Sequence, residues 1–260
     1  MPILRQGDED MKIFLAGTDG KTEARRVVRE NCLYALDTFY YVNTSKPSDH
    51  RRFEDYLLDS GAFSFMNSGK EITPGQLEDY VHSYADYIVK NDIPHYFELD
   101  IDRIIGYDKV LKIREYLEKT TQRPCIPVWH DWRGKQNFID MCDRYDFVAL
   151  GGFAKSKGRN KVLWQYIKNF IDEAHRRHAK IHGLGFTKHE NLPDCPFDTV
   201  DSSSWLSGGQ YGMIWRFAGD KMEHRQRQTH EKLNISGYNQ LELANGLEWV
   251  KFQKYAKEHL

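Results

Sequence analysis

The chain has 260 residues, of which 40% are hydrophobic and 29% are charged, so it can bury a sizeable core and is not wholly disordered. Its 37 Lys and Arg residues nearly balance its 38 Asp and Glu residues, which excludes a globally basic nucleic-acid binder but leaves local basic patches open. The sequence contains no repeat, low-complexity tract or linker, and it predicts a single domain over residues 1–260.

No stretch approaches the ~18 consecutive apolar residues that a membrane span needs. Residues 1–17 place acidic side chains where a secretion signal would be basic and then apolar. We therefore expect a cytoplasmic protein, in the host cytoplasm if it is viral, with no membrane partner. The four cysteines are scattered, with no two at Cys-x-x-Cys spacing, which argues against a disulfide framework and against a cysteine-rich zinc site.

Eight short apolar runs predict eight strands, because such runs are typical of strands buried on both faces of a parallel sheet. In chain order they are Ile13–Ala16, Phe39–Val42, Tyr56–Leu58, His95–Leu99, Ile126–Trp129, Phe147–Leu150, Lys180–Leu184 and Phe197–Val200. Segments with helical periodicity lie between them. This alternation predicts an α/β fold, a (β/α)8 TIM barrel over residues 11–205.

The clearest predicted helix begins at Thr73 and Pro74, a capping residue followed by the residue favoured in a first turn. Its apolar stripe is Leu77, Tyr80, Val81, Tyr84 and Ile88, and later stripes are Val110, Ile113, Leu117 and Val162, Tyr166, Ile167, Phe170, Ile171. Residues 206–260 are predicted to form an extension, an irregular loop and then a C-terminal helix with Leu243, Leu247, Val250 and Tyr255 roughly in phase.

Polar and glycine residues follow the predicted strands, at the end where barrel enzymes build their active sites. The segments are Asp59-Ser60-Gly61-Ala62-Phe63, Asp100-Ile101-Asp102, His130-Asp131, Gly151-Gly152, Gly183-Leu184-Gly185 and Asp201-Ser202-Ser203-Ser204-Trp205. Each segment alone has an ordinary explanation as a helix cap or a turn. Together they predict a polar site at one mouth of the barrel.

Basic residues also follow strands and predict a ring of cations that would hold phosphates. The clusters are Lys21, Arg25, Arg26 after the first strand, Lys155, Lys157, Arg159, Lys161 after the sixth, and Lys221, Arg225, Arg227, Lys232 after the last. The alternative is a solvated surface of mixed charge, since Glu23, Glu30, Glu223 and Glu231 are interleaved with these cations.

Other common site chemistries find little support. The first strand lacks the His-x-His pair of barrel metallohydrolases, and His175 and His178 fall near a helix end, away from the predicted mouth. The sequence has neither a nucleophile elbow nor a phosphate-cradling glycine loop of the usual types. We therefore expect no metal.

Five of the strand-end segments resemble motifs of the tRNA-guanine transglycosylase superfamily, in the family's order from about residue 56 to 205. Asp59-Ser60-Gly61-Ala62-Phe63-Ser64 resembles the family's Asp-Ser-Gly-Gly/Ser-Phe-Gln segment, and Leu99-Asp100-Ile101 resembles its base-recognising aspartate segment. Leu150-Gly151-Gly152-Phe153-Ala154 is similar to its Gly-Gly-Leu-Ala loop, and His182-Gly183-Leu184-Gly185 to the following glycine turn. Val200-Asp201-Ser202-Ser203-Ser204-Trp205 is similar to the nucleophile segment of the archaeal members.

The departures from the family pattern concern the nucleic acid. The family's tRNA enzymes have a Cys-x-Cys-x-x-Cys…His zinc element after the nucleophile, whereas this chain has no cysteine after Cys195. It also lacks the archaeal RNA-binding domains, and His130 stands where a Gln is expected. In these respects it resembles the compact, zinc-free phage and bacterial enzymes that exchange guanine in DNA for a 7-deazaguanine. Homodimers are common in the family, so a homodimer is one expectation.

The resemblance implies the roles of the site residues. Asp201 would be the nucleophile that attacks C1′, and Asp59 the general acid and base. The substrate-binding residues would be Asp100, Asp102, His130, Gly151, Gly152, Gly183, Ser60 and Phe63. The phosphate contacts would be Lys155, Lys157, Arg159, Lys161, Arg225 and Arg227. No cofactor is implied beyond the incoming 7-deazaguanine. The alternatives are base exchange in tRNA, a barrel N-glycoside hydrolase that accepts no base, and a non-catalytic barrel that binds modified nucleic acid.

Overall fold

The computed structural model describes residues 11–42, 44–69, 72–152, 160–186, 192, 194–228 and 238–260. Seven parallel strands form one curled sheet with the order β3-β2-β1-β7-β6-β5-β4. The strands are β1 (Lys12–Ala16), β2 (Tyr34–Thr38), β3 (Asp55–Asp59), β4 (Val128–Trp129), β5 (Phe147–Leu150), β6 (Lys180–Gly183) and β7 (Thr199–Ser202). The chain is therefore a mixed α/β protein built on a parallel sheet, as the alternating pattern predicted.

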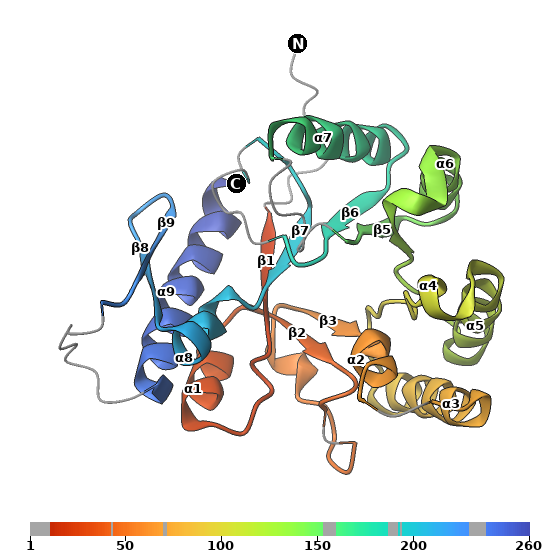
Figure 1. The fold of residues 1–260 in the computed structure, drawn as a ribbon, viewed down its shortest axis with the longest axis horizontal. Coiled ribbons are helices and arrows are strands. Elements are labelled where there is room, and N and C mark those ends of the chain that lie inside the picture. Colours follow the sequence, from red (N-terminus) through yellow and green to blue (C-terminus); the bar gives the residue numbers. More distant parts are fainter. Residues whose placement is uncertain are drawn as a thin grey trace.

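Helices surround the outside of this sheet (Figure 1). They are α1 (Glu23–Asn31), α2 (Ala62–Met66), α3 (Pro74–Asn91), α4 (Asp102–Ile105), α5 (Tyr107–Thr121), α6 (Gly134–Arg144), α7 (Asn160–Arg176), α8 (Ser207–Tyr211) and α9 (Tyr238–His259). The predicted start of α3 is confirmed, because Thr73 and Gln76 form a reciprocal capping box ahead of Pro74. No helix in these described ranges is long and apolar enough to cross a membrane.

The predicted closed barrel of eight strands is confirmed only in part. The segment His95–Leu99 lies between the sheet edges β3 and β4 but makes single bridges, Leu58 to Tyr96 and Phe97 to Ile126, instead of a strand. The ladder between this segment and β4 stops because the N–H of Val128 donates to the side-chain Oε1 of Glu98, at 2.8 Å, and not to a backbone carbonyl. A buried carboxylate thus takes the hydrogen bond that would extend the ladder.

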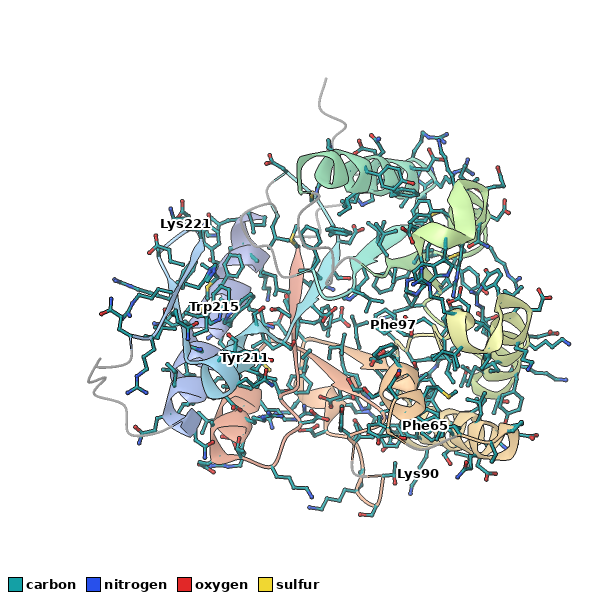
Figure 2. All side chains as sticks on the ribbon, in the orientation of Figure 1. Phe65, Lys90, Phe97, Tyr211, Trp215 and Lys221 are labelled. Atoms are coloured by element: carbon teal, nitrogen blue, oxygen red, sulfur yellow. The ribbon has the colours of Figure 1, made fainter. Side chains whose placement is uncertain are left out.

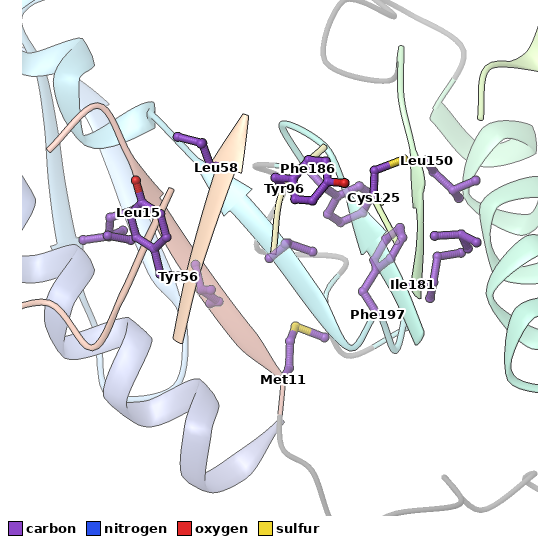
Figure 3. Packing of buried hydrophobic residues seen from close by; sticks show 14 of the residues in the cluster. Met11, Leu15, Tyr56, Leu58, Tyr96, Cys125, Leu150, Ile181, Phe186 and Phe197 are labelled. Atoms are coloured by element: carbon purple, nitrogen blue, oxygen red, sulfur yellow. The ribbon is translucent and has the colours of Figure 1, made fainter. Parts of the chain in front are cut away.

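Alternate residues along the strands pack into two separate clusters, as the two faces of a sheet require. The outer cluster joins the sheet to the helices and includes Leu15, Tyr56, Leu58, Leu150 and Ile181, several of which Figure 3 shows. The inner cluster fills the concave side and consists of Phe14, Tyr34, Leu36, Leu57, Phe97, Ile126, Val128 and Ala149. Because strands from both edges contribute to the inner cluster, the interior is a packed core and not a pore.

The second predicted strand, Phe39–Val42, is wrong, because β2 comes earlier, at Tyr34–Thr38. Phe39 instead packs against Tyr80, Tyr84 and Tyr87 of α3, with ring centroids 5.1–5.6 Å apart. The apolar run therefore marks a helix contact just beyond the strand. Asp37 made the true strand look polar, but it is buried in an ion pair with Arg29.

The extension is more regular than predicted. Strands β8 (Met213–Phe217) and β9 (Met222–Gln226) form an antiparallel hairpin where an irregular loop was expected. The C-terminal helix is confirmed as α9, and Val250 is buried on it while Leu243 and Tyr255 pack against the outer cluster. Figure 2 shows Lys221 at the outer end of the hairpin, on the side away from Phe97.

Candidate functional site

A cavity of about 1020 Å³ lies at the C-terminal ends of the parallel strands. Residues following each of the seven strands, and residues following His95–Leu99, line it. Among the lining residues are Asp59, Asp100, Asp102, His130, Gly151, Gly152, Asp201 and Phe63. The structure thus brings together eight of the ten catalytic and substrate-binding residues that the sequence predicted, from segments far apart in the chain.

Asp59 is the last residue of β3, and its surroundings favour the protonated form. Burial, and then the nearby carboxylates of Asp100 and Asp201, raise the pKa of Asp59 from 3.8 to about 7. Its Oδ2 accepts a hydrogen bond from the N–H of Gly61 at 3.2 Å. Gly61 has a φ of +64°, and a Cβ there would lie 2.7 Å from Cβ of Tyr40, so the turn that supplies this N–H requires glycine.

Asp201, on β7, is held at one oxygen and left open at the other. Its Oδ1 accepts the N–H of Gly185 at 2.6 Å and lies 3.2 Å from Nε2 of His182. No hydrogen bond from the described residues reaches its Oδ2. Because Asp201 also lines the cavity, this oxygen is placed to react with a bound molecule.

His182 is a candidate positioning residue that the sequence analysis treated only as part of a glycine turn. It is fully buried on β6, against Phe14 and Phe97 of the inner cluster. Its Nδ1 lies 2.7 Å from Oγ1 of Thr199. Since a carboxylate only accepts, Nε2 of His182 donates to Asp201 and Nδ1 accepts from Thr199. A histidine within an apolar strand, directly before a glycine, was the available signal.

Asp100 and His130 form a second pair in the cavity. Nε2 of His130 lies 3.2 Å from Oδ2 of Asp100, and the His130 side chain is buried. The ring packs against the backbone of the Gly151-Gly152 turn, where a Cβ on Gly151 would lie 2.5 Å from Cε1 of His130. Gly151 is therefore needed for His130 to adopt this position, which is a packing role in addition to any contact with a ligand.

Asp102 lines the cavity but is engaged by protein groups. Its Oδ2 accepts from Nε1 of Trp132 at 2.8 Å and from Nε of Arg133 at 2.9 Å. Burial disfavours the charged form, but these hydrogen bonds outweigh it and hold the pKa of Asp102 below its usual value. Arg133 also contacts Glu98, which pairs with Arg114. Asp102 therefore belongs to a buried ionic network that supports the wall of the cavity.

Other predicted residues lie elsewhere. Ser60 is buried beneath the turn after β3, where its carbonyl accepts from the hydroxyl of Tyr80 at 2.6 Å. Gly183 faces Phe186 and Phe197, within 3.2 Å of where its Cβ would be, and does not line the cavity. Both are close-packed turn or strand residues, so the structure gives neither a contact surface in the cavity.

Only part of the predicted ring of cations lines the cavity. Arg225 and Arg227 lie at and beyond the end of β9 and do not line the cavity. Lys155, Lys157 and Arg159, and the side chain of Lys161, lie outside the described residues. Among the described residues, the cations that line the cavity are Lys21 and Arg25, both from the predicted ring, and Arg103. Arg25 is paired with Glu242 at 2.8 Å.

Exposed apolar side chains surround the mouth. Tyr41, Phe63, Ile104 and Trp132 line the cavity, and all four are at least 42% exposed. Aromatic faces around a polar cavity are typical of sites that stack on planar ligands such as nucleobases. Asp19 adds a further carboxyl at the mouth; burial and then the charge of Asp37 raise its pKa to about 6.

Comparison with known proteins identifies no family for this chain. The chain matches no protein-family model, and a search of the curated proteins found no significant match. Within the described part of the chain, no three His, Cys, Asp or Glu side chains are grouped so that they could hold a metal ion.

Proposed function

We propose that this protein is a guanine transglycosylase that exchanges guanine in DNA for a 7-deazaguanine base. The observation on which this rests is the pair of carboxyl groups in one cavity with opposite environments. Asp59 has a pKa raised to about 7, whereas Asp201 has one oxygen anchored by Gly185 and a second that accepts no hydrogen bond from the described residues. Base exchange with retention at C1′ needs one carboxyl group as acid and base and one as nucleophile.

In the first step, the free Oδ2 of Asp201 attacks C1′ of the deoxyribose, and the bond from C1′ to N9 of guanine breaks. The proton of Asp59 goes to the leaving guanine, so that a neutral base departs and a covalent deoxyribosyl ester forms on Asp201. In the second step, Asp59 accepts a proton from the incoming 7-deazaguanine, whose N9 attacks C1′ and releases Asp201. The hydrogen bonds from Gly185 and His182 stabilise the carboxylate as it departs.

Recognition of guanine follows from the carboxylate of Asp100. Guanine presents N1–H and an amino group as adjacent donors on one edge, and a carboxylate accepts from both; adenine lacks N1–H. The contact of Asp100 with His130 fixes the orientation of the carboxylate. Phe63, 56% exposed at the mouth, would stack on the extruded base and offset the cost of removing it from the helix stack.

The position of the cavity in the fold also supports this proposal. We interpret the curled sheet and the bridging segment His95–Leu99 as an incomplete (β/α)8 barrel, with the site at the end where barrel enzymes place their catalytic residues. The choice of DNA over tRNA rests on the resemblance to the zinc-free enzymes and on the sequence after Asp201, which contains no cysteine.

The test is release of guanine. The protein would be incubated with DNA, or in parallel tRNA, labelled in guanine, with 7-cyano- or 7-aminomethyl-7-deazaguanine added. Released guanine would be counted and the digested nucleosides analysed by mass. We expect release from DNA that depends on the added base, and a deazaguanosine product. Release from tRNA alone would move the substrate to tRNA, release without incorporation would identify a hydrolase, and no release from either would refute the proposal.

A further inference from the structure

A stacked pair of side chains at the rim of the cavity has no role in the exchange reaction described above. The guanidinium carbon of Arg103 lies 3.7 Å from the ring centroid of Trp132. The Trp132 ring is in turn parallel to the His130 ring, with centroids 4.3 Å apart and an interplanar angle of 6°. Arg103, Trp132 and His130 all line the cavity, so this stack forms part of its wall.

The stack is held in place from below. Asp102, which is buried, accepts a hydrogen bond from Nε1 of Trp132 at 2.8 Å and one from Arg133 at 2.9 Å. Arg133 is itself fixed by Glu98 at 3.0 Å. The plane of the indole is therefore set by buried charges, and the flat guanidinium of Arg103 that lies against it is ordered before any ligand arrives.

Arg103 is exposed, and within the described residues its side chain makes no hydrogen bond or ion pair. A guanidinium that stacks uses its flat face and keeps five N–H donors around its edge, which suits two parallel hydrogen bonds to phosphate oxygens. A lysine could not do both, because its ammonium is a point charge on a flexible stem. The pair thus presents an ordered, unneutralised anion-binding group beside the cavity.

The floor of the cavity requires such a group at the rim. Asp59, Asp100 and Asp201 line the interior, and the carboxylates of Asp100 and Asp201 oppose negative charge on Asp59. A polynucleotide that delivers a base into this cavity brings its phosphates toward those carboxylates. The phosphates must therefore be held outside the floor, where a cation offsets the repulsion.

We propose that Arg103, ordered on Trp132, binds a backbone phosphate next to the extruded nucleotide and so fixes the path of the target strand. This inference rests on the proposed function for the presence of a strand, but it concerns phosphodiester binding alone. Phosphate contacts do not depend on sequence. Arg103 would therefore contribute equally to binding of a guanine-containing strand and of a strand without guanine.

The test is equilibrium binding of fluorescein-labelled single-stranded oligonucleotides, one containing guanine and one of thymine only, followed by fluorescence anisotropy over a range of salt. The variants are Arg103→Ala, Arg103→Lys and, as a matched control, Arg144→Ala. Arg144 is also an exposed arginine over an aromatic ring, 5.4 Å from Tyr145, but it ends α6, at the opposite end of the sheet. Each alanine variant removes one guanidinium that lies over an aromatic ring, and Arg144→Ala also removes an ion pair with Glu118 at 4.0 Å.

We expect Arg103→Ala to weaken binding of both oligonucleotides by about tenfold at low salt and to make the slope of log K against log salt shallower by about 0.7. Arg103→Lys should recover part of the affinity. Arg144→Ala should bind both oligonucleotides as tightly as the unaltered protein does. Equal losses in Arg103→Ala and Arg144→Ala, a loss confined to the guanine-containing strand, or no binding by the unaltered protein would each overturn the proposal. Guanine release is measured separately: its absence with Arg103-dependent binding would refute the transglycosylase and leave the phosphate site standing.

Discussion

Asp59→Asn should stabilise the fold while it stops the reaction. The pKa of Asp59 rises from 3.8 to about 7 on folding, because burial and two neighbouring carboxylates oppose its charge. Folding therefore retains a proton that the unfolded chain loses. The stability present below pH ~4 is lost as pH rises toward 7, and the loss then stays constant at roughly 4 kcal/mol.

Asparagine has the same shape and no charge, and its side-chain oxygen can still accept from the N–H of Gly61. The free energy of unfolding of Asp59→Asn should thus equal that of the unaltered protein near pH 4 and exceed it by up to about 4 kcal/mol at pH 8. Urea unfolding at both pH values, with intrinsic fluorescence and circular dichroism as probes, measures the difference.

The control is Asp55→Asn, the same chemical change at the other end of β3. Asp55 is paired with Lys12 at 2.9 Å, so its substitution removes a favourable contact and should give no gain at pH 8. If Asp59→Asn is no more stable than the unaltered protein at pH 8, or gains equally at pH 4 and pH 8, then Asp59 is not held near neutrality by its surroundings, and its assignment as the acid fails.

The remaining predictions concern turnover. Asp201→Asn should abolish guanine release and leave oligonucleotide binding largely intact; near-normal release would rule out Asp201 as the nucleophile. Single-turnover guanine release should fall as pH rises above about 7, because Asp59 then loses the proton it donates, and a flat profile to pH 9 would contradict this. His182→Leu should lower kcat by about 10- to 100-fold with little change in KM for DNA, while His182→Gln, which keeps a donor, should recover part of the rate. Equal kcat values in these two variants would assign His182 to packing alone.

Local signals in the sequence were enough for most of the elements. Pro74 after Thr73 defined the start of α3, and the apolar runs located β1, β3, β5 and β6. Two predicted strands were wrong for different reasons. In His95–Leu99 a side chain accepts the hydrogen bond that a backbone carbonyl would accept in a strand, and in Phe39–Val42 the apolar residues pack on a helix. The carboxylate of Glu98 takes the N–H of Val128, which no local pattern reveals. The hairpin β8–β9 was missed because only one residue on each strand, Trp215 and Met222, is buried.

The site was more predictable than the fold around it. In a parallel sheet all the C-terminal strand ends lie on one side. The polar residues that follow the strands could therefore be predicted to share one site, and Asp59, Asp100, His130 and Asp201 do line one cavity. The sequence could not tell which of these is free to react. That depends on hydrogen bonds between residues far apart in the chain, such as the contact of Gly185 with Asp201.

Four aspartates follow neighbouring strand ends, and their partners divide them into different roles. Asp102 is bound by Arg133 and Trp132, which keeps it charged and makes it a support of the wall. Asp201 and Asp100 each have one oxygen held by a donor, and no hydrogen bond from the described part of the chain reaches the other oxygen. Asp59 accepts from the N–H of Gly61 and from the side chain of Thr38, and it lies near the other two carboxylates. Because like charges in one cavity cannot all be ionised cheaply, Asp59, whose pKa is raised by burial and by the other two carboxylates, is the group that keeps a proton near neutral pH.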